Sequence, residues 1–357
     1  MNELLIKSKI KDYKVVFKTN VVEVSETIKI LPNKVLIVDA NVLSIYRTEI
    51  EDMAGDGDII PFKAVEDNKD LDAVAEFYAY LIDRNAKRNI NLVSVGGGIT
   101  QDVTGFVAST LYRGINWTFV PTTFLAQTDS CIGSKTSLNF QNRKNLLGTF
   151  YPPSIIYLCP AFLSSLKTID YYSGIGESIK FQLMNPFVKP DLQDVGQKIE
   201  RLRKYELLDE VIMENMAVKI NYMENDEFDL GRRNLLNYGH CFGHALEISS
   251  VYDIPHGIAV SIGILFAGVV SVNRGIMSSS MFEGIRKIIL PCLPVRYEER
   301  HYERNMLLSA MKNDKKRTGS RLSIVLSDND FMLSKYDDLE EKEFYEALKT
   351  LIVTLER

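Results

Sequence analysis

The sequence predicts an α/β domain built on a mostly parallel sheet, followed by a mainly α-helical domain. Up to about residue 160, short apolar runs rich in β-branched residues alternate with helix-compatible runs, which is typical of parallel strands joined by helices. From about residue 161 helical periodicity dominates. A chain of 357 residues is long enough for two domains with a sizeable core. We therefore expect domains at residues 1–167 and 168–357.

Composition narrows the class of protein. The formal net charge of −5 gives no electrostatic reason to expect nucleic acid as a partner. The four cysteines are widely spaced, which argues against a disulfide framework or a cysteine zinc cluster. The first residues lack the apolar segment of a signal peptide, and the most apolar long run, residues 258–272, is shorter than a membrane span. These features predict a soluble, cytoplasmic protein with no membrane partner.

The elements expected in the first domain follow the apolar pattern. Residues 4–30 alternate and favour strands, and helical patterns cover residues 71–88 and 99–111. Further apolar runs predict buried strands at residues 34–38, 59–65, 91–95 and 117–120.

Three of these strands end at residues suited to a ligand. The strand at 34–38 ends at Asp39, the strand at 91–95 runs into Gly96–Gly98, and the strand at 117–120 leads to Thr122. Ligands of parallel sheets gather at the carboxyl ends of strands, and a glycine turn before a helix lets backbone N–H groups approach a phosphate. The same glycines could serve tight packing alone.

Residues 129–148 are polar and too long for a simple turn. They carry Lys135, Arg143 and Lys144, and a long loop with clustered cations suits an anion. Taken alone, however, the segment favours a solvated loop over an anion site.

The second domain is predicted from helical periodicity. Helices are expected at residues 171–184, 192–203, 207–222, 233–249, 256–273, 279–289, 305–312 and 340–355, with short strands at 322–326 and 331–333.

Three of the four histidines of the chain lie between residues 232 and 260. His240 and His244 are four residues apart, which on a helix places both imidazoles on one face, and His256 opens the next predicted helix. This concentration suits a divalent metal site with an added acid or base. From the spacing alone, three histidines packed in a helical core is an equally open interpretation.

The motifs from residue 96 onward resemble the sugar phosphate cyclases and, within them, the 3-dehydroquinate synthase family. The matching segments keep the order of the family: residues 96–153, GESIK at 176–180, RNLLNYGHCFGHALE at 233–247, HGIAV at 256–260 and MKNDKK at 311–316. Before residue 90 the resemblance is limited to residues 39–41 and the pair Glu66 and Lys69. It implies a Rossmann-like, NAD-binding first domain, a metal- and substrate-binding second domain, and a homodimer.

The resemblance also implies a catalytic metal. Its ligands would be Glu177, His240 and His256, and such a set with open positions suits Zn²⁺ or Co²⁺. His244 falls on the acid/base histidine of the family.

Two sets of ligand-binding residues follow from the same resemblance. The NAD positions are Asp39, Asn41, Glu66, Lys69, Gly97, Gly98, Asp102, Thr122, Thr123, Lys144, Phe162 and Ser165. The substrate positions are Arg113, Asp129, Lys135, Asn145, Lys180, Lys219, Arg233, Asn237 and Lys315. Most of the second set are cations, which suits a substrate with a carboxylate and a phosphate. Lys135, Lys180 and Asn237 are expected to act in catalysis with His244, and Lys316 is an alternative to Lys315.

The chain departs from the family pattern at three places. Ser134 stands where glycine is usual, Ile258 stands where a glutamate usually follows the last metal ligand by two residues, and no glycine follows Lys180 and Phe181. Carboxylates beside metal ligands tune metal sites, so Ile258 bears on metal affinity or substrate choice.

The implied reaction is carried out by a lyase of the shikimate pathway, which leads to aromatic amino acids. It converts 3-deoxy-D-arabino-heptulosonate 7-phosphate to 3-dehydroquinate and phosphate by transient oxidation with NAD, phosphate elimination, re-reduction and intramolecular aldol closure. Arg233, Asn237 and Lys315 favour this substrate over sedoheptulose 7-phosphate or glucose 6-phosphate, which related cyclases use. Two further interpretations stay open, namely a metal-dependent polyol dehydrogenase and a non-catalytic binding protein.

Overall fold

The computed structural model of the 357-residue chain describes residues 3–141, 143–251, 253–294, 301, 303–312 and 321–355. The chain divides into two compact units, Met1–Leu166 and Lys167–Arg357. This division lies one residue before the boundary expected from the sequence.

Unit 1 is built on a seven-stranded sheet with the order β1-β2-β9-β6-β5-β3-β4. β1 and β2 pair antiparallel, and every other neighbouring pair is parallel. The strands are β1 (Glu3–Ile6), β2 (Tyr13–Phe17), β3 (Lys34–Asp39), β4 (Asp58–Phe62), β5 (Asn91–Gly96), β6 (Asn116–Pro121) and β9 (Ile155–Leu158). The predicted α/β domain with a mostly parallel sheet is confirmed.

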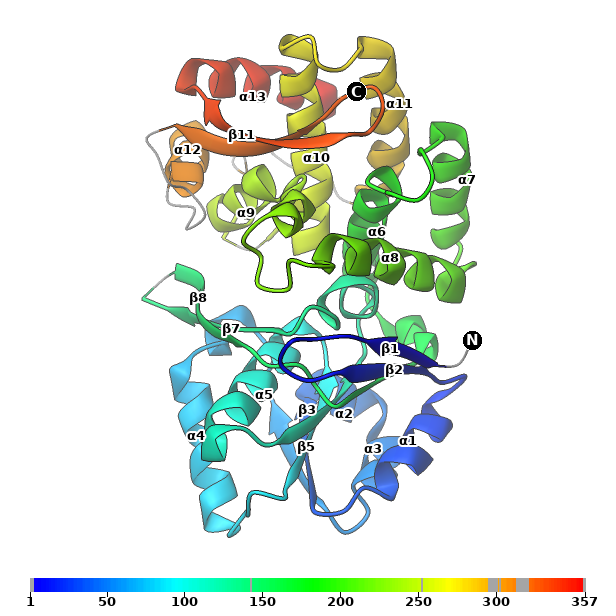
Figure 1. Cartoon of the computed structure of the whole chain (residues 1–357), viewed down its shortest axis with the longest axis vertical. Helices are drawn as coiled ribbons and strands as arrows, with labels where there is room; N and C mark the ends of the chain where they lie inside the picture. The colour runs from blue at the N-terminus through cyan, green and yellow to red at the C-terminus, as the bar shows by residue number, and fades with distance from the viewer. Residues whose placement is uncertain are drawn as a thin grey trace. The chain divides into compact units, whose positions relative to one another are not determined.

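Helices cover both faces of this sheet (Figure 1). On one face, α1 (Val21–Lys29) and α3 (Arg47–Ala54) share a core with β3 and β5. On the other, α4 (Leu71–Asp83) lies beside α5 (Gly98–Thr110), which contacts β5 and β6. The central strands are therefore buried along nearly their whole length, as their continuous apolar runs predicted. The remaining short elements of this part are α2 (Ala40–Ile45), η1 (Glu66–Asn68), η2 (Leu111–Arg113), η3 (Ala126–Ser130) and η4 (Pro160–Ser165).

The strand expectation for residues 4–30 is wrong beyond β2. Residues 21–29 form α1, because the Asn20 side chain accepts a hydrogen bond from the backbone N–H of Glu23 and caps the helix. Val24 and Ile28, four residues apart, then become fully buried on one helix face. Burial outweighs the preference of β-branched residues for strands.

The segment at residues 129–148 is not a loop throughout. β7 (Lys135–Phe140) and β8 (Arg143–Phe150) pair antiparallel as a hairpin. Thr136 and Leu138 are buried while their neighbours in β7 are more exposed. The polar residues on the open face of this hairpin hid the period-two alternation that marks a strand.

Unit 2 is a helical domain centred on α10 (His256–Asn273), as predicted. The other elements are α6 (Thr168–Leu183), α7 (Leu192–Leu202), α8 (Leu208–Met223), η5 (Arg232–Asn237), α9 (His240–Ser249), α11 (Ser279–Ile289), η6 (Leu290–Cys292), α12 (Arg304–Lys312), β10 (Leu322–Ser327), β11 (Leu333–Leu339) and α13 (Glu341–Leu355). α10 is long and apolar enough to cross a membrane by composition, yet 83% of it is buried and it packs against α6, α9, α11 and α13. It is the core helix of this unit.

One predicted helix of unit 2 is broken. The helix expected at residues 233–249 consists of η5 and α9, separated by Gly239 in the left-handed region at φ +77°. A Cβ at this residue would lie 2.6 Å from the carbonyl oxygen of Val260 in α10. Glycine therefore serves both the bend and the close approach of the two helices, and α9 starts at His240.

Candidate active site

A close contact between two helices of unit 2 brings candidate metal ligands together. A Cβ added at Gly176 in α6 would lie 2.0 Å from the carbonyl oxygen of Gly257 in α10. A Cβ added at Gly257 would lie 1.8 Å from the carbonyl oxygen of Ser173. Only glycine fits such an approach of backbones. The contact sets Glu177 beside His256, because Glu177 directly follows Gly176 and His256 directly precedes Gly257.

Three helices then converge on one carboxylate. Oε1 of Glu177 lies 3.3 Å from Nε2 of His240 in α9 and 3.2 Å from Nε2 of His256 in α10. The ring of His244, one turn further along α9, has its centroid 5.3 Å from that of His240 and 5.5 Å from that of His256. The structure thus brings the four residues that the sequence singled out into one cluster.

This cluster offers two possible ligand sets. The ligand atoms of His240, His244 and His256 lie within 4.8 Å of one another, which would suit a three-histidine site. Glu177 with His240 and His256 is the alternative. We favour the second set because both Nε2 atoms already face the same carboxylate oxygen, and it leaves His244 available for proton transfer.

The rings of His240 and His256 each have a hydrogen-bond acceptor at Nδ1, on the side away from Glu177. Nδ1 of His240 lies 3.2 Å from the carbonyl oxygen of Tyr238, and Nδ1 of His256 lies 2.9 Å from Oε2 of Glu247. An acceptor at Nδ1 assigns the ring proton to that nitrogen and turns the lone pair of Nε2 toward the opposite side. In both rings Nε2 then faces Glu177.

Glu177 supplies an observation that tests whether a cation fits. The carboxylate is fully buried, and in the described part of the chain neither of its oxygens accepts a hydrogen bond. Nζ of Lys180 lies 2.5 Å from Oε2, whereas the described groups that face Oε1 are the two imidazoles. A buried carboxylate needs charged or hydrogen-bonding partners, and Lys180 supplies one at Oε2 but not at Oε1. One carboxylate and two imidazole nitrogens are donors that Zn²⁺ and Co²⁺ accept, so the residues fit such an ion.

Electrostatics in the cluster favour an ionised Glu177 and a protonated His256. Burial raises the pKa of Glu177, but Lys180 and His240 outweigh burial and hold that pKa well below its usual range. Burial and Lys180 lower the pKa of His240, against the pull of Glu177. Burial also lowers the pKa of His256, but Glu247 and Glu177 outweigh it and raise the pKa to about 10. A proton on His256 therefore occupies the place of a cation, and a metal ion would have to displace it.

The predicted substrate residues of unit 2 are buried cations and one amide. Lys180, Lys219 and Arg233 are 1%, 7% and 3% exposed. Nζ of Lys180 also lies 4.4 Å from the ring centroid of Phe181. Asn237 donates from Nδ2 to the carbonyl oxygen of Asn234 at 2.7 Å.

The loop before η5 fixes Arg233. The carboxylate of Asp226 accepts hydrogen bonds from the backbone N–H groups of Leu230, Gly231 and Arg233. The guanidinium group of Arg233 donates to the carbonyl oxygen of Glu227. Lys315 and its neighbour Lys316 lie outside the described residues, so their predicted role stays a prediction.

In unit 1, the strand ends chosen from the sequence lie side by side. The backbone N–H of Thr122 donates to the carbonyl oxygen of Gly96 at 2.9 Å. A Cβ at Gly96 would lie 3.2 Å from Cβ of Asp39. The side chain of Asp39 caps α2 by accepting from the backbone N–H of Asn41 at 2.8 Å.

The start of α5 forms an open cradle at this edge. Gly97 is the N-cap residue, and no described side chain caps the helix. A Cβ at Gly98 would meet only Oγ of Ser130, at 3.6 Å, whereas a Cβ at Gly97 would lie 2.9 Å from Thr123. The first N–H groups of a helix lack acceptors within the helix and attract anions. This cradle fits the pyrophosphate of a dinucleotide.

A polar cluster joins η1, α5 and the β7–β8 hairpin. Nζ of Lys69 lies 2.5 Å from Oδ2 of Asp102 and 2.7 Å from Oδ1 of Asn145. Ser137 donates to the same two oxygens, at 2.9 and 2.8 Å. Burial raises the pKa of Asp102, and Lys69 opposes that rise.

A second part of this cluster is centred on Glu66. Its Oε1 accepts from Nδ2 of Asn139 at 2.9 Å and lies 3.6 Å from Nζ of Lys144. Oδ1 of Asn139 in turn accepts from the backbone N–H of Asn145 at 3.0 Å. Four predicted cofactor residues and one predicted substrate residue therefore form one network: Glu66, Lys69, Asp102, Lys144 and Asn145.

The remaining predicted residues of unit 1 have varied environments. Arg113 is exposed at φ +62°, Asn145 lies at φ +52°, and Asp129 lies in the π-helical turn η3. Such backbone conformations are rare and concentrate at functional sites. Phe162, by contrast, is fully buried in the core with its ring edge-on to Tyr46. Ser165 donates within η4 to the carbonyl oxygen of Phe162.

Sequence reasoning missed three residues that contact the candidate ligands or cofactor residues directly. Ser137 and Asn139 were missed because the hairpin was taken for a loop, although they alternate with buried residues along β7. Glu247 was missed although it follows His240 by seven residues and His244 by three, which places all three on one helix face.

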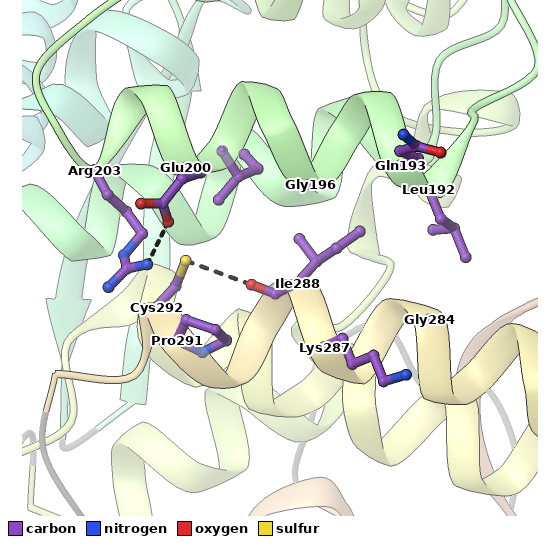
Figure 2. Close-up of a pocket in the computed structure, with 11 residues that line it drawn as sticks. Leu192, Gln193, Gly196, Glu200, Arg203, Gly284, Lys287, Ile288, Pro291 and Cys292 are labelled. Atoms are coloured by element: carbon purple, nitrogen blue, oxygen red, sulfur yellow. Dashed lines mark hydrogen bonds and ion pairs between the residues drawn. The ribbon is translucent and has the colours of Figure 1, made fainter.

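Unit 2 also has a groove of about 340 Å³ between α7 and α11 (Figure 2). Two contacts join polar groups of its lining: Nη1 of Arg203 lies 2.6 Å from Glu200, and Sγ of Cys292 lies 3.5 Å from the carbonyl oxygen of Ile288. Burial raises the pKa of Cys292 to about 12, so the thiol is not a nucleophile near neutral pH. None of the lining residues is a predicted site residue, and we assign no chemistry to this groove.

Known proteins share both the sequence motifs and the fold of this chain. The family model described as 3-dehydroquinate synthase N-terminal matches residues 59–173, and the one described as 3-dehydroquinate synthase C-terminal matches residues 174–317. The 3-dehydroquinate synthase of Clostridium tetani (strain Massachusetts / E88) is 34% identical over 329 residues, which cover 88% of this chain and 86% of that protein. This chain belongs to the 3-dehydroquinate synthase family.

Solved structures with the same fold include other cyclases. A 2-deoxy-scyllo-inosose synthase, in complex with carbaglucose-6-phosphate, NAD⁺ and Co²⁺, has a TM-score of 0.84 at 23% identity, with 98% of this chain and 99% of that chain covered. The 2-epi-5-epi-valiolone synthase of Streptomyces hygroscopicus subsp. jinggangensis 5008, with NAD⁺ and Zn²⁺ bound, has a TM-score of 0.83 at 22% identity, with 97% and 98% covered. These likenesses support the fold expected for the 3-dehydroquinate synthase family.

Proposed function

We propose that this chain is a 3-dehydroquinate synthase of the shikimate pathway. It would convert 3-deoxy-D-arabino-heptulosonate 7-phosphate to 3-dehydroquinate and phosphate. The observation that carries the proposal is the convergence of Glu177, His240 and His256 beside His244 in a chain that is 34% identical to a 3-dehydroquinate synthase.

Two bound groups complete the proposed site. When bound, NAD supplies a transient hydride transfer at C5 of the substrate, and a divalent cation, Zn²⁺ or Co²⁺, supplies polarisation of the C5 hydroxyl. Glu177, His240 and His256 would hold the cation. The cradle at Gly97 and Gly98 would hold the pyrophosphate of NAD. The other proposed NAD contacts are Asp39, Asn41, Glu66, Lys69, Asp102, Thr122, Thr123, Lys144, Phe162 and Ser165.

The residues of the chain bind, orient and move protons. His244 lies against both histidine ligands without being needed as a ligand, and an imidazole is suited to proton transfer near neutral pH. Lys180, Lys219 and Arg233 are buried cations that suit the carboxylate and phosphate of the substrate. Asn237 would hydrogen-bond the substrate, and Arg113, Asp129, Lys135, Asn145 and Lys315 are the further proposed substrate residues.

The test is a product assay on the full chain with NAD⁺ and Zn²⁺ or Co²⁺. We expect phosphate and 3-dehydroquinate in equal amounts from 3-deoxy-D-arabino-heptulosonate 7-phosphate, without net NADH. Glu177→Gln should remove the activity, because it loses the charged metal ligand. Glu343→Gln is the matched control, because Glu343 is a carboxylate of the same unit that pairs with Arg274 instead.

Other outcomes would change the assignment. Phosphate release from sedoheptulose 7-phosphate or glucose 6-phosphate, but not from the expected substrate, would make the protein a related cyclase and attach importance to Ser134 and Ile258. Net NADH formation with a polyol would make it a dehydrogenase of the same fold.

Two further parts of the proposal rest on the family resemblance. We expect a homodimer, which light scattering in solution would show as twice the mass of the chain. We also expect the protein in the cytoplasm, which fractionation of the producing cells would test.

A further inference from the structure

We propose that Glu247 is a positioning residue that orients His256 for metal binding and strengthens it as a ligand. The proposal rests on the metal site assigned under the proposed function. It concerns a residue that makes no predicted contact with metal, substrate or cofactor itself.

Geometry places Glu247 directly behind a metal ligand. Its Oε2 lies 2.9 Å from Nδ1 of His256, while Nε2 of the same ring lies 3.2 Å from Oε1 of Glu177. The imidazole is therefore held between two carboxylates, one at each nitrogen. Glu247 comes from α9 and His256 begins α10, so this contact also joins the two helices that carry the histidine ligands.

Burial indicates that the contact between Glu247 and His256 is a structural feature and not a chance surface contact. Glu247 is 5% exposed, and glutamate is almost never buried to this degree unless it is paired. Ile258, two residues after His256, is 1% exposed and has no polar atom in its side chain. The carboxylate at His256 thus comes from another helix, not from the segment that carries the ligand.

The two histidine ligands differ in their rear acceptors. His240 has a neutral carbonyl oxygen at Nδ1, whereas His256 has a carboxylate. A carboxylate at Nδ1 fixes the tautomer and makes the ring more basic, and removing such a partner usually weakens metal affinity about 10- to 100-fold. We therefore expect His256 to depend on its rear acceptor more strongly than His240.

The experiment measures metal affinity of the purified full chain. Bound metal is removed with a chelator, and Zn²⁺ is then titrated in competition with a chromogenic chelator, while Co²⁺ is followed by its visible absorption. Glu247→Ala should weaken binding of both ions about 100-fold, and Glu247→Gln, which keeps an acceptor without the charge, about 10-fold. The Co²⁺ spectrum of Glu247→Ala should also change, because the ring is free to turn.

Controls separate this proposal from the metal site itself. Glu343→Gln should bind both ions as the wild-type chain does. If the wild-type chain binds neither ion, the proposed metal site fails and not the role of Glu247 alone. If Glu247→Gln and Glu247→Ala bind within twofold of a metal-binding wild type, the role of Glu247 is overturned. Should Glu247→Ala fail to fold, the isosteric Glu247→Gln decides: about tenfold weaker binding supports the proposal and unchanged binding overturns it.

Discussion

The polar cluster around Lys69 in unit 1 is closed by its own side chains, whereas the histidine cluster of unit 2 leaves one carboxylate oxygen facing two imidazoles. In unit 1, Lys69 contacts both Asp102 and Asn145, and the hydroxyl oxygen of Ser137 lies 2.9 and 2.8 Å from the same two oxygens. In unit 2, Oε2 of the buried Glu177 pairs with Lys180, while Oε1 faces the imidazoles of His240 and His256. The second cluster is therefore arranged to receive a positive charge at Oε1.

This difference follows from how each cluster is built. The histidine cluster lies on three helices locked by contacts between glycine backbones, so its donors cannot turn away from each other. The cluster of unit 1 involves a hairpin and a short turn, whose side chains can pair locally. A ligand of unit 1 must therefore replace existing hydrogen bonds, whereas a cation in unit 2 would replace a proton on His256 as the partner of Oε1 of Glu177.

The largest expected effect comes from breaking the helix contact that enforces the second arrangement. Gly257→Ala would place a Cβ 1.8 Å from the carbonyl oxygen of Ser173, so α6 and α10 must separate. We expect a loss of about 3 kcal/mol or more in the free energy of unfolding, at the upper end for overpacking. Metal binding should be lost with it. Urea unfolding and chelator competition measure the two effects.

A second helical glycine controls for the substitution itself. A Cβ at Gly196 in α7 would meet Ile288 at 3.6 Å, which is an ordinary contact. Gly196→Ala should therefore stabilise the protein by up to about 1 kcal/mol and leave metal binding unchanged. Normal stability and normal metal binding in Gly257→Ala would show that the helix contact does not enforce the cluster.

An intermediate effect is expected from the matched cluster of unit 1. Asp102→Asn removes the carboxylate partner of Lys69, which is 6% exposed, and should lower the free energy of unfolding by about 1.5 to 3 kcal/mol. NAD⁺ affinity should fall about tenfold, which is about 1.4 kcal/mol. Metal affinity should be unchanged, because the described side-chain contacts of Asp102 are with Lys69 and Ser137. Urea unfolding and NAD⁺ titration are the measurements.

The pH dependence of this variant has a defined sign. Because burial raises the pKa of Asp102 above its ordinary value of 3.8, the native carboxylate takes up a proton before the unfolded one as the pH falls. The wild type therefore gains stability as the pH falls toward 3.8, whereas asparagine takes up no proton, so the stability difference between wild type and Asp102→Asn should grow over this range. Asp52→Asn is the control, since its pair with Lys29 is exposed and screened by solvent. A difference that shrinks on acidification above pH 3.8 would contradict this account of Asp102.

How much the sequence predicts also differs between the two clusters. Three of the four residues of the histidine cluster lie within a short stretch, two of them at helical spacing, so the pattern is visible in the sequence. Only the resemblance points to Glu177 and to the division between ligands and acid/base. The glycine contact between residues 176 and 257 could not be foreseen, because it joins positions far apart in the chain. In unit 1 the strand ends followed from apolar runs, but the hairpin did not, since its polar face masked the strand pattern and hid Ser137 and Asn139.

The smallest expected effect concerns strain in unit 1 beside Lys135. Ser134 lies at φ +63°, is 6% exposed, and its hydroxyl has no hydrogen-bond partner in the described part of the chain. The left-handed conformation costs a non-glycine residue about 1 to 2 kcal/mol, which the flexibility of glycine in the unfolded chain partly offsets. Ser134→Gly should therefore stabilise the protein by about 0.5 kcal/mol, measured by thermal unfolding.

Ser134→Ala tests the hydroxyl separately from the backbone strain. Alanine lacks the hydroxyl but keeps a Cβ, so the strain at positive φ remains. If the serine is only strained, the alanine variant should match wild type in stability and in substrate KM, while the glycine variant alone gains stability. A rise in KM in both variants would instead show that the hydroxyl contacts the substrate. The buried hydroxyl of Ser134 would then be a polar group of unit 1 that is arranged for a ligand, as Glu177 is in unit 2. The two clusters would then differ only in degree. A glycine variant less stable than wild type would contradict the strain itself.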